Sequence, residues 1–158
     1  MKPSKTLILG IGNHLMSDDG VGGQALLRLA TETAGMTGVS FLDGGTLGYL
    51  LVGHIEGSDD LIVIDAAQLN APPGTVQIFE NDDMDRFLNT NANRSVHEVG
   101  LSDLLGMAYL GGHFPRRRAL IAIQPQETDI GIKLSQPVSQ SLPKVCEKVL
   151  DLMQRWKG

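Results

Sequence analysis

The hydrophobic positions of the chain fall into two kinds of stretch: short continuous runs, and longer segments in which apolar residues recur every three or four positions. Continuous runs are typical of strands buried on both faces, and the longer spacing is typical of helices that pack along one face. The continuous runs predict strands at 5–11, 38–43, 60–66, 74–80 and 118–125. The helical spacing predicts helices at 20–34, 46–57, 95–110 and 137–156, and the polar segment 82–94 predicts a helical turn followed by a loop.

The order of these elements predicts the fold class. Strands and helices alternate along most of the chain, as they do in α/β domains. The strand at 74–80 follows the strand at 60–66 after a connection too short for a parallel crossover, so it is expected to pair antiparallel. We therefore expect a single three-layer α/β domain over residues 1–158, with a twisted, mostly parallel five-stranded sheet, one antiparallel strand and helices on both faces.

Two helix starts carry sequence signals. Ser17 precedes the apolar spacing of the first helix and is expected to be its N-cap. Asp18 and Asp19 would then lie in the first turn, where acids complement the helix dipole. Further along the chain, Ser95 and Glu98 match the S-x-x-E capping box, which predicts that a later helix begins at Ser95.

Composition narrows the classes of function. The net charge of −5 argues against nucleic-acid binding, which needs a basic face, and the only basic run, 116–118, is expected to be solvated where it leads into a strand. No run approaches the roughly 18 apolar residues of a membrane span, so membrane insertion is not expected. The single cysteine, Cys146, fits a reducing cytoplasm and is expected to be a small buried residue.

Acidic residues lie where three of the predicted strands end. In open α/β sheets, ligands bind outside the carboxyl ends of the strands, and Asp19, Asp43 and Asp65 occupy these positions. The first loop begins G-x-G like a dinucleotide-binding turn, but Leu15 replaces the third glycine and the acids would repel a phosphate. Nucleotide binding is therefore not favoured. Asp65, which ends an apolar strand, is interpreted either as a cap for backbone amides or as a ligand or catalytic acid.

His97 adds an imidazole to these carboxylates. In the capping-box register it lies in the first turn of its helix, where the dipole disfavours protonation and leaves the neutral imidazole that binds metals. Asp19, Asp65 and His97 then form an oxygen and nitrogen ligand set for a divalent metal. The other histidines are weaker candidates: His14 in the first loop, His54 on a helix surface and His113 in a turn.

The segment 43–46, with the sequence D-G-G-T, follows the second predicted strand. It only superficially resembles the D-T-G or D-S-G triplet of aspartic proteases. Its glycines would let another backbone approach closely, as a peptide substrate does, or would form a tight strand-to-helix turn. The pattern alone leaves both interpretations open.

Four segments, taken in order, resemble the NiFe-hydrogenase maturation endopeptidases. The segment 7–22, "LILGIGNHLMSDDGVG", is similar to the family's G-x-G-N-x-L-x-x-D-D/E-x-x-G pattern. "LDGGT" at 42–46 and "LIVIDA" at 61–66 resemble its D-G-G-T segment and its third strand, and "SVHEVGLSDLL" at 95–105 resembles its S-x-H-x-x-G-L-x-D-x-L helix. Each piece alone is weak, but the combination in this order is specific.

The resemblance implies a function and a set of site residues. Enzymes of this family cut a short C-terminal extension from the NiFe-hydrogenase large-subunit precursor after nickel has been inserted. The metal-contacting residues of the family fall on Asp19, Asp65 and His97, with nickel brought by the precursor. The family often has Glu at the position of Asp19. The segment associated with substrate handling and cleavage specificity consists of Asp43, Gly44, Gly45 and Thr46.

The resemblance leaves the chemistry of cleavage open. We hypothesise that cysteine thiolates of the precursor share the nickel with the enzyme and that the metal positions the scissile bond. Asp19 and Asp65 are the catalytic candidates: either is a candidate base for the attacking water, and attack by a metal-bound water is the alternative. Two alternatives remain at this point: a non-catalytic nickel- or nucleotide-binding accessory module, and another hydrolase on the same scaffold, such as a phosphorylase or a spore-type endopeptidase.

Overall fold

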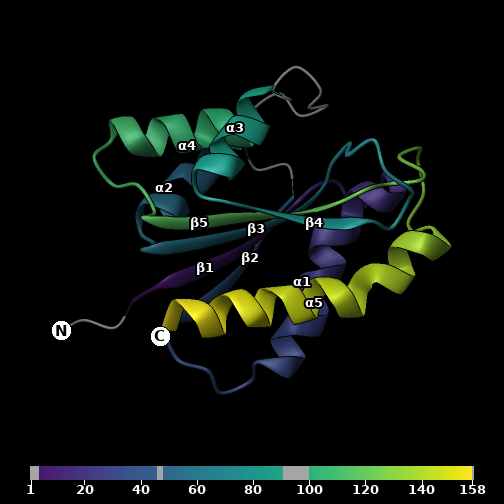
Figure 1. Cartoon of the computed structure of the whole chain (residues 1–158), viewed down its shortest axis with the longest axis horizontal. Coiled ribbons are helices and arrows are strands. Elements are labelled where there is room, and N and C mark those ends of the chain that lie inside the picture. The colour runs from purple at the N-terminus through teal and green to yellow at the C-terminus, as the bar shows by residue number, and fades with distance from the viewer. Residues whose placement is uncertain (1–3, 46–47, 91–99, 158) are drawn as a thin grey trace.

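A computed structural model describes residues 4–45, 48–90 and 100–157. Within these residues five strands form one sheet in the order β2-β1-β3-β5-β4 (Figure 1). The strands are β1 (Thr6–Ile11), β2 (Val39–Gly45), β3 (Asp60–Ala66), β4 (Val76–Glu80) and β5 (Arg117–Ile123). The helices are α1 (Val21–Glu32), α2 (Leu51–Glu56), α3 (Asp82–Thr90), α4 (Leu101–Leu110) and α5 (Gln136–Lys157), with short 3-10 turns η1 (Ser17–Gly20) and η2 (Gly48–Leu50).

The sheet is mixed, which confirms the predicted fold class. β1 pairs in parallel with β2 and β3, β3 pairs in parallel with β5, and β4 pairs antiparallel with β5. The antiparallel direction of β4 was expected from its short connection to β3. Its neighbour is nevertheless β5, because β1 and β5 already occupy both edges of β3. β4 therefore lies at the outer edge of the sheet.

Helices cover both faces of the sheet and form two apolar cores. α1 and α5 lie on one face, and α2, α3 and α4 lie on the other (Figure 1). Successive side chains of a strand point to opposite faces, so Ile62 and Ile64 of β3 enter the first core while Leu61 and Val63 enter the second. This double burial explains why the strands appear in the sequence as continuous apolar runs.

Two predicted helix starts are wrong. Ser17 is not the N-cap of α1, because its backbone is left-handed, with a φ of +52°, and its hydroxyl donates to the carbonyl of Asp129 at 2.7 Å. α4 begins at Leu101 rather than at Ser95, because Gly100 is extended and its N–H donates to the carboxylate of Asp103 at 3.2 Å. Ser95, Glu98 and His97 lie outside the described residues.

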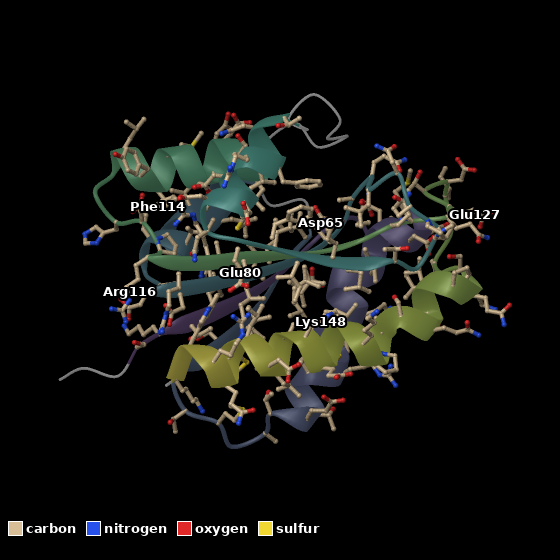
Figure 2. All side chains as sticks on the ribbon, viewed as in Figure 1. Asp65, Glu80, Phe114, Arg116, Glu127 and Lys148 are labelled. Carbon is tan, nitrogen blue, oxygen red and sulfur yellow. The ribbon has the colours of Figure 1, made fainter. Side chains whose placement is uncertain are left out.

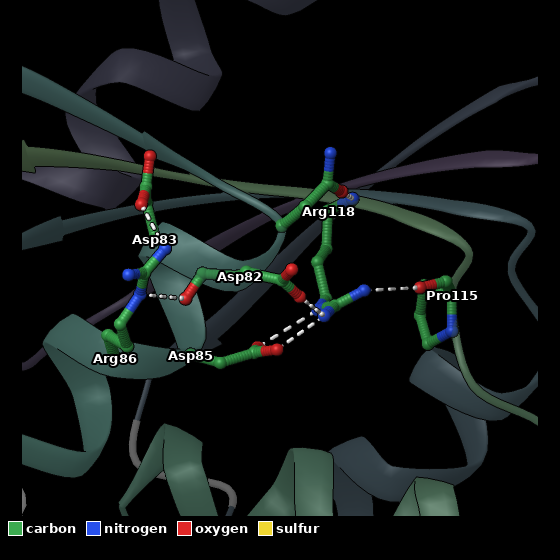
Figure 3. A network of polar contacts seen from close by, with 7 residues as sticks. Asp82, Asp83, Asp85, Arg86, Pro115 and Arg118 are labelled. Carbon is green, nitrogen blue, oxygen red and sulfur yellow. Dashed lines mark hydrogen bonds and ion pairs between the residues drawn. The ribbon is translucent and has the colours of Figure 1, made fainter.

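The basic run was expected to be solvated, and this is wrong for two of its three residues. The guanidinium of Arg117 donates to both carboxylate oxygens of Asp60 at 2.8 Å. Arg118, whose side chain is only 11% exposed, donates to Asp85 and lies 3.8 Å from Asp82 (Figure 3). Both arginines lie at the beginning of β5, between neighbouring strands, so their charges are neutralised by acids of the same chain.

Composition also predicted a buried cysteine and the absence of a membrane-spanning segment. Cys146 on α5 is free and buried, as predicted. None of the described helices is long and apolar enough to cross a membrane.

Candidate catalytic site

Glycines bring the first loop against the ends of β1 and β3. Gly12 has a φ of +127°, and a Cβ there would lie 1.9 Å from the backbone oxygen of Asp19. A Cβ on Gly22 would lie 2.5 Å from the carbonyl oxygen of Ile64. Since only glycine permits such approaches, this packing places Asp19 beside the residue that follows Ile64, which is Asp65.

Asp19 and Asp65 form an acidic pair at the carboxyl edge of the sheet. Asp19 is half-buried, and its Oδ2 accepts the backbone N–H of Asn13 at 2.8 Å. Asp65, labelled in Figure 2, is also half-buried as a residue, but its Oδ1 is fully buried and has no hydrogen-bond partner in the described part of the chain. A buried carboxylate oxygen without a hydrogen bond costs free energy until a partner from outside the described residues, a water or a ligand binds it.

The electrostatics of the pair are unusual. Burial raises the pKa of the Asp65 carboxyl well above 3.8, and the negative charge of Asp19 raises it further. A hydrogen bond from the backbone of Ala66 opposes these effects only in part. Two adjacent carboxylates of this kind share a proton or bind a cation, because either removes their mutual repulsion.

Asp18, the neighbour of Asp19, has a different role that the sequence did not reveal. It is fully buried, and its carboxylate accepts the backbone N–H groups of Gln126, Glu127 and Ser135 and the hydroxyl of Ser135 at 2.7 to 2.9 Å. Burial alone would raise the pKa of Asp18, but these hydrogen bonds outweigh it and lower the pKa. Asp18 therefore anchors the loop 126–135 beside the candidate site.

Asp43 lies two residues before the end of β2, at the same edge of the sheet. Its Oδ1 accepts the backbone N–H of Gly45 at 3.0 Å, and its Oδ2 lies 2.5 Å from Nε2 of His14. Gly44 packs closely against Leu51 of α2, where a Cβ would approach to 3.0 Å. Thr46, the last residue of the D-G-G-T segment, lies outside the described residues.

The predicted ligand set is brought together only in part. Asp19 and Asp65 are neighbours, whereas His97 lies outside the described residues. Within 4–45, 48–90 and 100–157, no group of three or more His, Cys, Asp or Glu side chains has a metal-holding arrangement. Two carboxylates with one orphaned oxygen nevertheless suit a divalent cation that takes its remaining ligands elsewhere.

Comparison with known proteins identifies the family. A family model described as HycI, hydrogenase maturation protease, matches residues 23–152. The chain belongs to the hydrogenase maturation protease family. This confirms the predicted family and peptidase activity over the alternatives of an accessory module or a phosphorylase-like hydrolase.

Relatives of this protease match along nearly the whole chain. The hydrogenase expression/formation protein HoxM of Azotobacter vinelandii is 37% identical over 154 residues, which are 97% of this chain and 74% of HoxM. The hydrogenase 2 maturation protease of Escherichia coli K12 is 31% identical over 92% of this chain and 88% of its own length. Among solved structures, the Escherichia coli hydrogenase maturating endopeptidase HybD superposes with a TM-score of 0.86 at 29% identity, covering 96% of this protease and 93% of HybD.

Proposed function

We propose that this protease removes the C-terminal extension of a nickel-loaded NiFe-hydrogenase large-subunit precursor and so allows that subunit to mature. The observation that carries the proposal is the Oδ1 of Asp65, buried beside Asp19 and without a hydrogen-bond partner within 4–45, 48–90 and 100–157, in a protein of the hydrogenase maturation protease family. A processing enzyme needs a way to recognise a precursor that has already received its metal. The buried Oδ1 of Asp65, which has no hydrogen-bond partner among the described residues, supplies a contact for that metal.

Asp19, Asp65 and His97 are the proposed contacts to the nickel of the precursor. Carboxylates and imidazole bind divalent nickel, and precursor thiolates would complete its coordination. In the free enzyme, the raised pKa of Asp65 favours retention of a proton within the acidic pair. Binding of the nickel-loaded precursor would displace that proton, because the cation replaces it as the neutralising charge.

The proposed catalytic step is hydrolysis of a peptide bond held beside the same pair. Fixing the scissile bond in place lowers the barrier by up to about 7 to 11 kcal/mol in ideal cases. Asp19 or Asp65 then accepts the proton of the attacking water, a step that typically contributes about 10² to 10⁴ in rate. The same two residues thus carry both the recognition and the catalytic roles.

The proposed contacts with the precursor polypeptide lie around this pair. Asp43, Gly44, Gly45 and Thr46 are the substrate-handling segment. Beyond them, Leu15, Ile130 and Ile132 are 62%, 89% and 76% exposed. Met16 and Gly131 form a bridge that joins the two loops carrying these side chains. Such exposed aliphatic groups support binding of an extended, partly apolar segment of the precursor.

The proposal is tested by incubating the purified enzyme with precursor that contains or lacks nickel and following the mass of the large subunit. We expect the nickel-loaded precursor to lose its C-terminal extension and the nickel-free precursor to stay intact. Equal cleavage of both precursors would remove the recognition role of nickel. An intact nickel-loaded precursor would contradict the proposed substrate.

A further inference from the structure

The contact between His14 and Asp43 is not explained by the proposed roles of Asp19 and Asp65. His14 belongs to the loop after β1, and Asp43 belongs to the end of β2. Their side chains meet at 2.5 Å and are 46% and 45% exposed. Because an ionised carboxylate only accepts hydrogen bonds, Nε2 of His14 is the donor. With Gly45 bound to Oδ1, both oxygens of Asp43 are held in place.

The first turns of α1 are shaped to receive the imidazole. A Cβ on the buried Gly23 would lie 2.1 Å from Cε1 and 2.7 Å from Nε2 of His14. A Cβ on Gly20 would come within 3.7 Å of Nδ1. The Cε1–Nε2 side of the ring therefore lies against Gly23, and its Nδ1 lies near Gly20, the residue before α1. Glycine is unfavourable inside a helix, so its presence at 23 has a local reason, which is the space for this ring.

Stability alone is a weak reason for such a contact. Ion pairs and hydrogen bonds between half-exposed side chains contribute little to folding, because water competes for both partners. The contact does fix the direction of an accessible carboxylate at the sheet edge where the substrate is proposed to bind. This favours a role in positioning.

The register of the sheet gives the distance over which Asp43 would act. Asp43 is paired with Gly10 of β1, and Gly10 is paired with Ile64 of β3, the residue before Asp65. Neighbouring strands lie about 4.8 Å apart, so β2 and β3 are separated by roughly 10 Å. An extended peptide covers this distance in about three residues.

We propose that His14 is a positioning residue that, seated on Gly23, holds the carboxylate of Asp43 toward the precursor about three residues from the scissile bond. The proposal rests on the proposed function, since it requires a polypeptide that is cut beside Asp19 and Asp65. His14 itself acts through Asp43, because its Nε2 is engaged by that carboxylate.

A double-mutant cycle tests this proposal with the nickel-loaded precursor as substrate. His14→Ala is expected to lower kcat/KM about tenfold, mainly through KM. Gly23→Ala is expected to have a similar effect, because the added methyl group displaces the ring. The double variant should be no worse than either single variant. His14→Gln, which retains an N–H donor, should stay within about threefold of the wild type.

The controls separate this proposal from the proposed function. His54→Ala removes an exposed imidazole on α2 and should leave kcat/KM unchanged. Melting temperatures should show that every variant is folded, and the double variant keeps the test valid if Gly23→Ala alone is unstable. Wild-type kinetics in His14→Ala, or losses that multiply in the double variant, would overturn the positioning role alone. Failure of the wild type to cut the precursor would instead overturn the proposed function.

Discussion

The two edges of the sheet handle buried charge in opposite ways. At the amino edge, where β3 and β5 begin, Asp60 is 2% exposed and is matched by the two-pronged contact of Arg117, and Arg118 is matched by Asp85 (Figure 3). At the carboxyl edge of β3, Asp65 faces the like charge of Asp19, and its Oδ1 has no hydrogen-bond partner in the part of the chain that the structure describes. The two groups of charges lie at opposite ends of the same central strands. They differ in the side chains that the fold places beside them.

The contrast distinguishes charged residues that stabilise the fold from charged residues that are proposed to bind a ligand. Removing one partner of a matched buried pair destabilises a protein, because the other charge stays buried alone. A buried acid without an opposite charge nearby contributes no such stabilisation, so its removal does not destabilise the fold. Enzymes retain such acids at sites where binding or catalysis needs them. Substitutions at the amino edge should therefore change folding, and substitutions at the carboxyl edge should change activity.

The largest effect is expected for Asp65→Asn, which keeps the shape of the side chain and removes its charge. Cleavage of the nickel-loaded precursor should fall by at least about 100-fold, since both the cation contact and a candidate base are lost. The unfolding free energy at pH 7 should not decrease. Single-turnover cleavage and urea unfolding measure the two quantities. Retained cleavage would remove Asp65 from the catalytic site.

Arg117→Met tests the opposite edge. It leaves Asp60 buried without its partner and should lower the unfolding free energy by about 3 kcal/mol. Folded enzyme should still cut the precursor at the wild-type rate. Arg116→Met, a neighbouring change at an exposed arginine, is the matched control and should stay within about 0.5 kcal/mol. Equal unfolding midpoints for the two variants in urea would contradict the assigned pairing.

The adjacent acids should give opposite pH dependences of stability. The pKa of Asp18 is lowered, so its contribution of about 1 to 3 kcal/mol is present above about pH 4 and is lost as the pH falls. Asp18→Asn should therefore be costly at pH 7 and nearly neutral in acid. The pKa of Asp65 is raised, so its penalty grows as the pH rises from about 4.

The free energy of unfolding of the two variants and of the wild type is measured between pH 3 and pH 7. This is roughly the range in which carboxyl groups titrate. Asp65→Asn should be more stable than the wild type by about 1 kcal/mol at pH 7, and this difference should disappear as the pH falls. Parallel pH profiles for the two variants would show that Asp18 and Asp65 do not differ as described.

The smallest effect is expected at the exposed apolar rim. Ile132→Ser removes an aliphatic side chain from the proposed precursor contact and should raise KM roughly threefold without changing kcat, because only part of the side chain is buried on binding. Leu110→Ser is the matched control, since Leu110 is 85% exposed at the end of α4, where the chain turns toward the start of β5 rather than toward the carboxyl ends of the strands. Similar KM values for both variants would exclude Ile132 from the contact.

Much of the fold could be predicted from the sequence because its signals are local. The run "DLIVIDA" predicted a strand at 60–66, and β3 covers these residues. Continuous apolar runs arise when a strand is covered on both faces, so the sequence also predicted the three layers of helix, sheet and helix. The positions of Asp19, Asp43 and Asp65 near strand ends also followed from the order of elements, which is why these residues could be named as candidates before their geometry was known.

Other features could not be predicted, because the partners are far apart in the sequence. Asp18 and Asp19 are adjacent acids of the same type, yet Asp18 is bound by Ser135, 117 residues away. The basic run predicted solvated arginines at 117 and 118, but Asp60 and Asp85 neutralise them inside the fold. No local periodicity encodes such pairings, and neither does it encode the fit of His14 over Gly23.

The sequence by itself determined the α/β architecture, the edge of the sheet that carries the acids, and the resemblance that the comparisons confirmed as family membership. Only the tertiary structure decided which of two neighbouring aspartates is an anchor, that Asp65 has an oxygen without a partner among the described residues, and that a histidine contacts Asp43. The physical reason is that burial and hydrogen bonding depend on which atoms meet in space. Hydrophobic periodicity records only which face of an element is covered.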